Sequence, residues 1–204
     1  MPNLSLELAQ TGRLFVFGTE GPMLLVRTEL DALPLKEINP ELPYASSVKG
    51  KGHLCGHDGH LTILVGLARK LAQKPIEGKR IALLFQPAEE AGQGGPEVVK
   101  DPIFQKHKPD AAIALHNIPG IPLGEVRIKD GAFTPASLGA TLFLEGKTSH
   151  AAEPHQGINP SLAMAQIAIK ASQMVQPDIS KANFSLLTPA ETRMGSKAFR
   201  LLAP

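Results

Sequence analysis

The chain has 204 residues, and its 21 Lys and Arg against 19 Asp and Glu give a net charge of +2 at pH 7. No basic run or arginine patch is present, so we expect neither a nucleic-acid partner nor binding to an anionic membrane surface. One cysteine cannot form an internal disulfide, no apolar stretch approaches the roughly 18 residues of a membrane helix, and no signal-peptide pattern opens the chain. We therefore expect a soluble, cytoplasmic protein.

The first part of the chain alternates short apolar runs with a helical pattern. Between two of the runs, apolar residues recur at helical spacing from Leu61 to Ala72, and Pro75 ends the pattern. Runs bounded by Gly, Pro or charge are typical of buried strands, and strand–helix alternation predicts an α/β fold with a mostly parallel sheet and flanking helices. The runs lie at 14–17, 23–30, 81–86 and 111–116.

The pattern changes near Phe133, where we place a boundary between residues 1–132 and 133–204. Residues 124–131 resemble a hairpin arm, and 137–148 and 183–189 resemble strands. These elements predict a second, smaller α/β unit that is too small to be stable by itself.

One helix is expected in this second unit, over 160–175. Asn159 followed by Pro160 is a strong helix start, because Asn caps the first turn and Pro suits the first helical position. The expected buried stripe consists of Met164, Ile167, Ala168, Ala171 and Val175.

Side chains able to bind a metal gather in GHLCGHDGH (52–60) and at the ends of three expected strands. Ligands of α/β sheets bind beyond the carboxyl ends of the strands, so we expect these side chains to line one cleft. The groups at the strand ends are Glu29 and Asp31, Glu89 and Glu90, and His116.

Thiolate, imidazole and carboxylate together suit zinc or another divalent ion of similar softness. Cys55 and His57 are two residues apart, so both can reach one ion, or one of them can share with a second ion. Of the neighbours Glu89 and Glu90, one can bind metal while the other takes a proton from water. That division of labour is usual in metal-assisted hydrolysis.

Each feature also has a purely structural interpretation. A histidine at a strand end, a Glu-Glu pair in a turn and a lone cysteine are all common without a catalytic role. The cluster C-x-H-D-x-H has no comparable explanation in packing, and with Glu90 and His116 it favours a metal site. A zinc site of purely structural kind fits less well, because such sites usually contain several cysteines.

Five segments, in this order over residues 14–176, resemble the metal-dependent amidohydrolases and peptidases that include hippurate hydrolase, aminoacylases and indole-acetyl-amino-acid hydrolases. They are RTELDALPLKE, HLCGHDGH, LFQPAEEAGQGG, ALHNIPGIPLG and GKTSHAAEPHQGINP. The resemblance implies a zinc-exopeptidase-like catalytic domain with two divalent ions (Zn, Mn, Co or Ni), of which 1–132 is a part. It also implies that 133–204 is part of a ferredoxin-like α+β lid, through which a homodimer forms.

The resemblance also implies roles for single residues. Glu89 is the general base that activates water, and Asp31 orients a ligand. His150, in GKTSHAAEPH, donates a hydrogen bond to the developing oxyanion, often across a dimer interface. The implied metal ligands are Cys55, His57, Glu90 and His116.

The chain departs from the family at one residue and at both ends. Glu29 occupies a position that usually carries Asp. A helical stretch before the first hairpin and a metal-ligating histidine near the C-terminus are not found, so we expect a chain that is truncated relative to the family. The leading hypothesis is hydrolysis of the amide bond of N-acyl amino acids or small peptides. The alternative is a catalytically dead remnant or a binding and assembly subunit.

Overall fold

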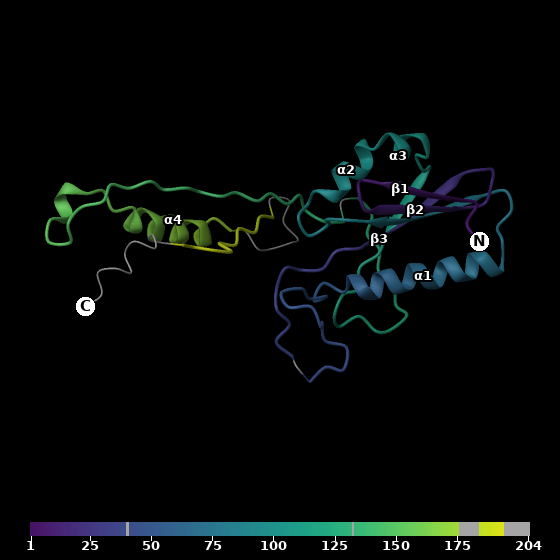
Figure 1. Cartoon of the computed structure of the whole chain (residues 1–204), viewed down its shortest axis with the longest axis horizontal. Coiled ribbons are helices and arrows are strands. Elements are labelled where there is room, and N and C mark those ends of the chain that lie inside the picture. Colours follow the sequence, from purple (N-terminus) through teal and green to yellow (C-terminus); the bar gives the residue numbers. More distant parts are fainter. Residues whose placement is uncertain (40, 132, 176–183, 194–204) are drawn as a thin grey trace. The chain divides into compact units, whose positions relative to one another are not determined.

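The computed structural model describes residues 1–39, 41–131, 133–175 and 184–193. The chain divides into two compact units, Met1–Val126 and Arg127–Pro204. The first unit contains a five-stranded sheet with helices on both faces, and the second contains one longer helix, α4 (Ser161–Gln173) (Figure 1).

The sheet of the first unit has the strand order β1-β2-β4-β3-β5. The β1–β2 and β2–β4 pairs are antiparallel, whereas β3–β4 and β3–β5 are parallel. The sheet is therefore mixed and not mostly parallel as expected. Its strands are β1 (Leu4–Leu8), β2 (Gly12–Phe17), β3 (Met23–Glu29), β4 (Arg80–Gln86) and β5 (Ala111–Ala114).

The antiparallel pairing of β1 with β2 follows from a tight turn. Ala9 and Gln10 have φ values of 45° and 66°, and the Thr11 N–H donates to the Ala9 carbonyl at 2.8 Å. Such a short link can join only antiparallel strands, whereas the long crossover through α1 (His57–Gln73) allows β3 and β4 to run parallel.

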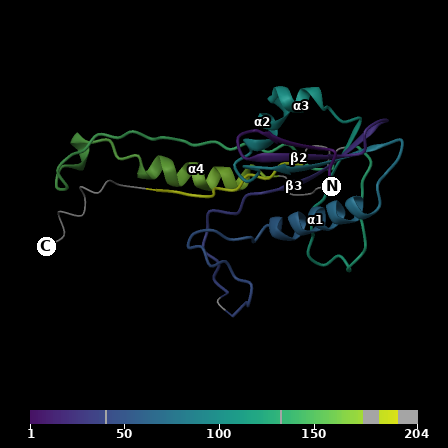
Figure 2. The ribbon, with the colours of Figure 1, turned by 45° about the vertical axis from the view of Figure 1, so that its right-hand side comes forward.

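The two faces of the sheet carry separate hydrophobic clusters. Along β4, Ala82 and Leu84 belong to the cluster that includes α2 (Gly94–Lys100) and α3 (Pro102–Lys106). Leu83 and Phe85 alternate with them and belong to the cluster under α1. Figures 1 and 2 show α1 on one side of the sheet and α2 and α3 on the other.

The helix expected after GHLCGHDGH is confirmed but begins earlier. α1 starts at His57, so His57 and His60 lie in its first turn and are buried, together with Leu64 and Leu71. The helix ends at Gln73, since Lys74 must be extended before Pro75. The expected strands at 23–30 and 81–86 are also confirmed.

The second unit differs from expectation in its strands. Residues 124–131 and 137–148 form no strand; Lys147 alone pairs there, in an antiparallel bridge with Ile158. The expected strand at 183–189 begins outside the described residues, and 184–189 form none. Ser185 is a single bridge residue within 184–189. An isolated bridge is not a strand, because a strand requires a run of paired residues.

α4 is present where the Asn-Pro signal predicted a helix. Asn159 Oδ1 accepts from the Ser161 N–H at 2.9 Å, so the Asn side chain satisfies a backbone donor at the start of the helix, whose N-cap residue is Pro160. The expected buried stripe is wrong: no residue of α4 is buried, and Met164, Ala168 and Ala171 are only half-buried. None of the helices in the described part of the chain combines the length and apolar character needed to cross a bilayer.

Candidate metal centre

The candidate centre lies at one edge of the sheet in the first unit. Because β3, β4 and β5 are parallel, their carboxyl ends share this edge. Asp31 follows β3, Glu89 and Glu90 follow β4, and His116 follows β5. The Leu30 N–H donates to the Gln86 carbonyl at 2.8 Å, which extends the β3–β4 pairing towards the site.

A long loop, 32–56, delivers the cysteine to this edge. Leu33 and Gly52 pair as an antiparallel bridge at the base of the loop. Above it, the Glu37 carboxylate accepts from the Ser46 N–H at 2.6 Å and from the His53 N–H at 3.0 Å. These bonds give shape to a segment that forms no helix or longer strand in its described part.

The turn after β4 is equally constrained. Ala88 has φ 49°, an uncommon value for a residue with a side chain, and its carbonyl accepts from the N–H groups of Gln93 and Gly94. A Cβ at Gly94 would lie 1.6 Å from the Pro87 carbonyl oxygen, so the turn requires glycine there. This turn sets the direction of the Glu89 and Glu90 side chains.

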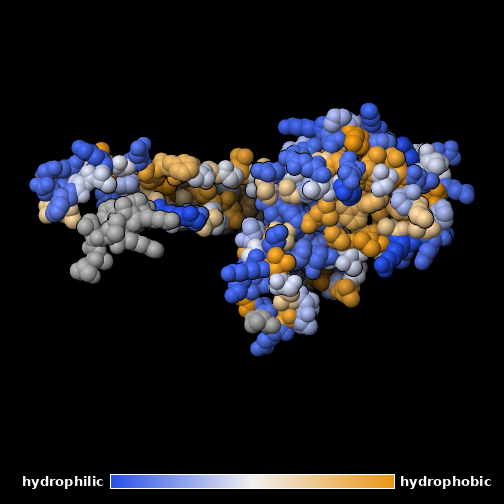
Figure 3. Space-filling model, viewed as in Figure 1, coloured by the Kyte–Doolittle hydropathy of each residue, from blue (hydrophilic) through white to orange (hydrophobic). Residues whose placement is uncertain are grey.

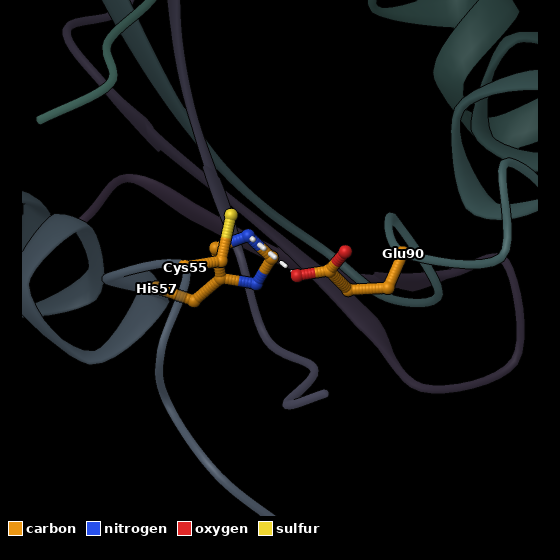
Figure 4. A group of neighbouring side chains, drawn as sticks. All are labelled: Cys55, His57 and Glu90. Carbon is orange, nitrogen blue, oxygen red and sulfur yellow. Dashed lines mark ion pairs between the residues drawn. The ribbon is translucent and has the colours of Figure 1, made fainter. Parts of the chain in front are cut away.

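Cys55, His57 and Glu90 form the centre of the site. One potential ligand atom from each lies within 4.8 Å of the others. Figure 4 shows Glu90 reaching from its own loop towards the His57 ring, with the Cys55 side chain beside that ring. His116 stands outside this group of three but contacts it, because its Nε2 lies 3.4 Å from the Cys55 Sγ.

The two histidines present the same nitrogen to the site. His57 Nδ1 lies 2.9 Å from the Asp31 carbonyl oxygen, and His116 Nδ1 lies 2.6 Å from the Asn117 carbonyl oxygen. A carbonyl can only accept, so Nδ1 is the donor nitrogen of each ring, and Nε2 is the nitrogen that each ring directs towards the site. Metal-binding histidines in proteins are commonly oriented in this way.

The electrostatics favour a cation. His57 Nε2 lies 3.6 Å from both Glu89 Oε2 and Glu90 Oε1, so this nitrogen faces two carboxylates. Burial, followed by the charges of Glu90, Glu89 and Glu29, raises the pKa of the Cys55 thiol to about 11. A positive charge among these groups would offset the repulsion, and the sulfur, nitrogen and oxygen donors therefore fit a divalent metal ion.

Asp31 connects two of these groups. Its Oδ2 accepts from the Glu90 N–H at 2.9 Å, and its Oδ1 lies 3.6 Å from His57 Nδ1. Oδ1 is buried and has no hydrogen-bond partner among the residues that the structure describes. Asp31 thus ties the turn after β4 to the start of α1.

Sequence reasoning missed the importance of His60 and Asn117. His60 is 1% exposed, and Glu29, also 1% exposed, lies 3.0 Å from its Nδ1. The helical spacing His57, His60, Leu64 is a signal that places His60 on the buried face of α1. Asn117 lies in the segment ALHNIPGIPLG, but nothing in that segment assigned it a role.

His150 lies in the second unit. It is exposed, and its Nδ1 accepts from the Ala152 N–H at 3.2 Å in a short turn. The described structure thus groups six of the seven candidate residues in the first unit, with His150 in the other unit.

Comparison with known proteins identifies relatives of the chain. The model of peptidase family M20/M25/M40 matches residues 25–199. The chain is 41% identical over 180 residues to the N-acetyl-L-cysteine deacetylase of Bacillus subtilis (strain 168), covering 87% of this chain and 42% of that protein. It is 32% identical over 198 residues to the IAA-amino acid hydrolase ILR1-like 5 of Arabidopsis thaliana. That match covers 96% of this chain and 44% of the Arabidopsis protein.

A solved structure is similar as well. The crystal structure of the Bacillus subtilis YXEP protein, described as a dinuclear metal binding peptidase from the M20 family, matches with a TM-score of 0.57 and 34% identity. The match covers 63% of this chain and 36% of that chain. The chain thus spans roughly half the length of the curated relatives that it matches, or somewhat less.

Proposed function

The chain belongs to peptidase family M20/M25/M40, and from that premise we propose that it acts in metal-dependent hydrolysis of the amide bond of N-acyl amino acids or small peptides. The observation that carries the proposal is the His57 Nε2, which faces two carboxylates at 3.6 Å beside a cysteine. Two similar proteins, a deacetylase of N-acetyl-L-cysteine and an IAA-amino acid hydrolase, support this substrate class by their names.

Two divalent ions, Zn, Mn, Co or Ni, would be held by Cys55, His57, Glu90 and His116. The dinuclear description of the similar Bacillus subtilis structure supports the number of ions. Ions at this place supply Lewis acidity towards water and towards an amide carbonyl. Asp31 orients His57 through its backbone carbonyl and holds the Glu90 turn through its side chain.

Glu89 is the proposed general base. Its carboxylate takes a proton from the attacking water and delivers it to the leaving amine. The Glu89 carboxylate lies 3.6 Å from His57 Nε2, which supports the assignment, because a base must lie beside the metal site to take the proton of the attacking water.

The second unit would act as part of a ferredoxin-like lid and as the dimer contact. His150 is the proposed donor to the oxyanion that develops on the amide carbonyl. Exposed apolar side chains support the dimer: Leu138, Leu142 and Phe143 are 100%, 70% and 91% exposed. We place the protein in the cytoplasm, because a cysteine ligand is best preserved in a reducing compartment.

A matched pair of substitutions tests this function. Glu89→Gln is expected to retain bound metal and to lose hydrolysis of N-acetyl amino acids by about 100-fold or more. Glu90→Gln, at the neighbouring position, is expected to lower the metal content itself. Elemental analysis counts the ions per chain, and release of the free amine measures hydrolysis.

Three results would contradict the proposal in different ways. Full activity of Glu89→Gln would show that Glu89 is not the general base. No metal on the wild-type chain would remove the metal site. Bound metal without hydrolysis of any N-acyl amino acid or small peptide would favour the binding and assembly role instead.

A further inference from the structure

A buried polar network lies directly behind the proposed metal site. Glu29, at the end of β3, forms an ion pair with Arg27 and lies 3.0 Å from His60 Nδ1. Arg27 also donates to the Gln86 side chain at 2.9 Å, so the network joins β3, β4 and α1. A buried carboxylate is costly unless it is paired, and here it has two partners.

His60 connects this network to the segment after β5. A carboxylate accepts, so His60 Nδ1 carries the proton and Nε2 is left as an acceptor. The Asn117 backbone N–H donates to that Nε2 at 3.0 Å. Asn117 Oδ1 lies 2.8 Å from the same nitrogen, and a half-turn of the amide would present its NH2 group, which suits the lone pair.

The Asn117 side chain also packs against the loop that carries Cys55. A Cβ at Gly56 would lie 2.5 to 2.8 Å from three atoms of the Asn117 amide group. Gly56 has φ 85° and stands between Cys55 and His57. The amide of Asn117 therefore rests on the backbone that separates two proposed ligands.

The backbone of Asn117 contacts a third proposed ligand. Its carbonyl accepts from His116 Nδ1, which directs His116 Nε2 towards the Cys55 Sγ. The His60 ring packs edge-on against the His116 ring, with centroids 4.7 Å apart. Asn117 thus contacts two segments: His116 after β5 through its backbone carbonyl, and the loop that carries Cys55 through its side chain.

We propose that Asn117 is a positioning residue for the metal site, held in place by the Glu29–His60 pair. It fixes the ring orientation of His116 and the position of the Cys55 backbone before a metal binds. Preorganised ligands lose less conformational freedom on binding, so the metal is held more tightly. This inference rests on the proposed function, because it requires that the site binds a metal.

Zinc affinity and the cobalt spectrum of the full chain test the proposal. Asn117→Ala keeps the backbone carbonyl that accepts from His116 Nδ1 and removes the amide that packs on Gly56, so it tests the contact with the Cys55 loop. It is expected to weaken zinc affinity about 10- to 100-fold, measured by competition with a chromophoric chelator. The Co²⁺-loaded variant is expected to show a changed thiolate-to-cobalt band and changed visible bands. Asn3→Ala is the matched control: it removes a 2.7 Å hydrogen bond to the Gly18 N–H, far along the chain, and is expected to leave both readouts unchanged.

A second pair of variants decides the matter if Asn117→Ala does not fold. His60→Leu removes the acceptor for the Asn117 N–H, whereas the amide of His60→Gln restores an acceptor at a similar distance. His60→Gln is expected to bind zinc more tightly than His60→Leu, at least about tenfold.

The results separate this proposal from the function on which it rests. If the wild-type chain binds neither zinc nor cobalt, the proposed function fails and the positioning role falls with it. If the wild type binds both while Asn117→Ala keeps wild-type zinc affinity and cobalt spectrum, the positioning role of the Asn117 side chain is overturned and the proposed function stands. Equal zinc affinity of His60→Leu and His60→Gln would also overturn it.

Discussion

Gly56 illustrates how one backbone conformation places two proposed ligands. With φ 85°, it turns the chain between Cys55, in the loop, and His57, in the first turn of α1. Residues with a Cβ rarely adopt this conformation, and here the Cβ would also meet the Asn117 amide. Both constraints act on the same position.

We predict that Gly56→Ala lowers both stability and metal affinity. Gly66→Ala is the matched control, since a Cβ there meets nothing within 4 Å and alanine favours a helix. Gly66→Ala is expected to raise the free energy of unfolding by roughly 0.5–1 kcal/mol. Urea denaturation and zinc competition measure the two effects. A Gly56→Ala variant with wild-type zinc affinity would show that the turn does not matter for the site.

Sequence reasoning located the proposed ligands because their types are rare and their positions follow the strands. Cys55 and His57 were expected on a loop, but His57 opens a helix, and that difference comes from Gly56 rather than from any helix-forming residue. Asn117 could not be recognised, because its role depends on a contact with Gly56 across 61 residues of chain.

At the scale of elements, α1 is held to the sheet mainly by its apolar stripe. Leu64 is fully buried in the cluster that includes Leu83 and Phe85, whereas the adjacent Ile63 is 55% exposed. We predict that Leu64→Ala lowers the free energy of unfolding by about 2–5 kcal/mol, because it opens a cavity under the helix. Ile63→Ala is expected to change it by less than about 1 kcal/mol. Similar unfolding midpoints for the two variants in urea would contradict this view of α1.

Asp101 links the turn after β1 to the start of α3. Its Oδ2 accepts from the Ala9 N–H and its Oδ1 from the Ile103 N–H, both at 2.8 Å. These bonds lower the pKa of the carboxyl below its ordinary value of 3.8, and the bond from Ala9 has the largest effect. The folded protein therefore keeps the charge at a pH where the unfolded chain has bound a proton. The resulting stabilisation is complete above pH 3.8 and disappears as the pH falls through the lower folded-state pKa.

We predict that Asp101→Asn lowers the urea midpoint at neutral pH and that the difference from wild type shrinks below pH 3.8. Asn at position 101 can still cap α3, but it offers the Ala9 N–H no charged oxygen. Asp130→Asn, at an exposed position, is the control and is expected to follow the wild type. A difference that stays constant from pH 7 to pH 3 would exclude the ionised carboxylate as its cause.

The elements that sequence reasoning recovered are those with a strong local signal. β3 and β4 are short apolar runs, and α1 has a clear period. β1 has an alternating pattern at the edge of the sheet, which resembles a loop when judged by apolar content alone. The strands expected in the second unit have the right composition, but composition cannot supply the neighbour that a strand requires.

At the scale of the whole molecule, apolar side chains remain on the surface of both units (Figure 3). Phe143 and Leu142, in the second unit, are more exposed than Val99, in the first. Isolated exposed apolar residues are ordinary, but clustered ones mark contact surfaces.

We predict that Leu142→Ser with Phe143→Ser weakens self-association at least about tenfold, since each buried large side chain contributes about 1.5–3 kcal/mol. Val99→Ser, on α2, is the control and is expected to associate as the wild type does. Sedimentation equilibrium over a range of concentrations measures the dimer fraction. A wild-type chain that stays monomeric throughout would remove the proposed dimer contact.

The proposed site is assembled from separate segments, so binding of the metal affects how long the protein survives in a cell. Asp31, Cys55, Glu90 and His116 come together only when β3, β4, β5 and α1 are assembled. An ion that binds this assembly, and not the unfolded chain, adds roughly 2.7 kcal/mol of stability at 100 times its dissociation constant. Metal starvation would then raise the unfolded population that proteases can cleave, so the supply of the ion would set the abundance of the protein.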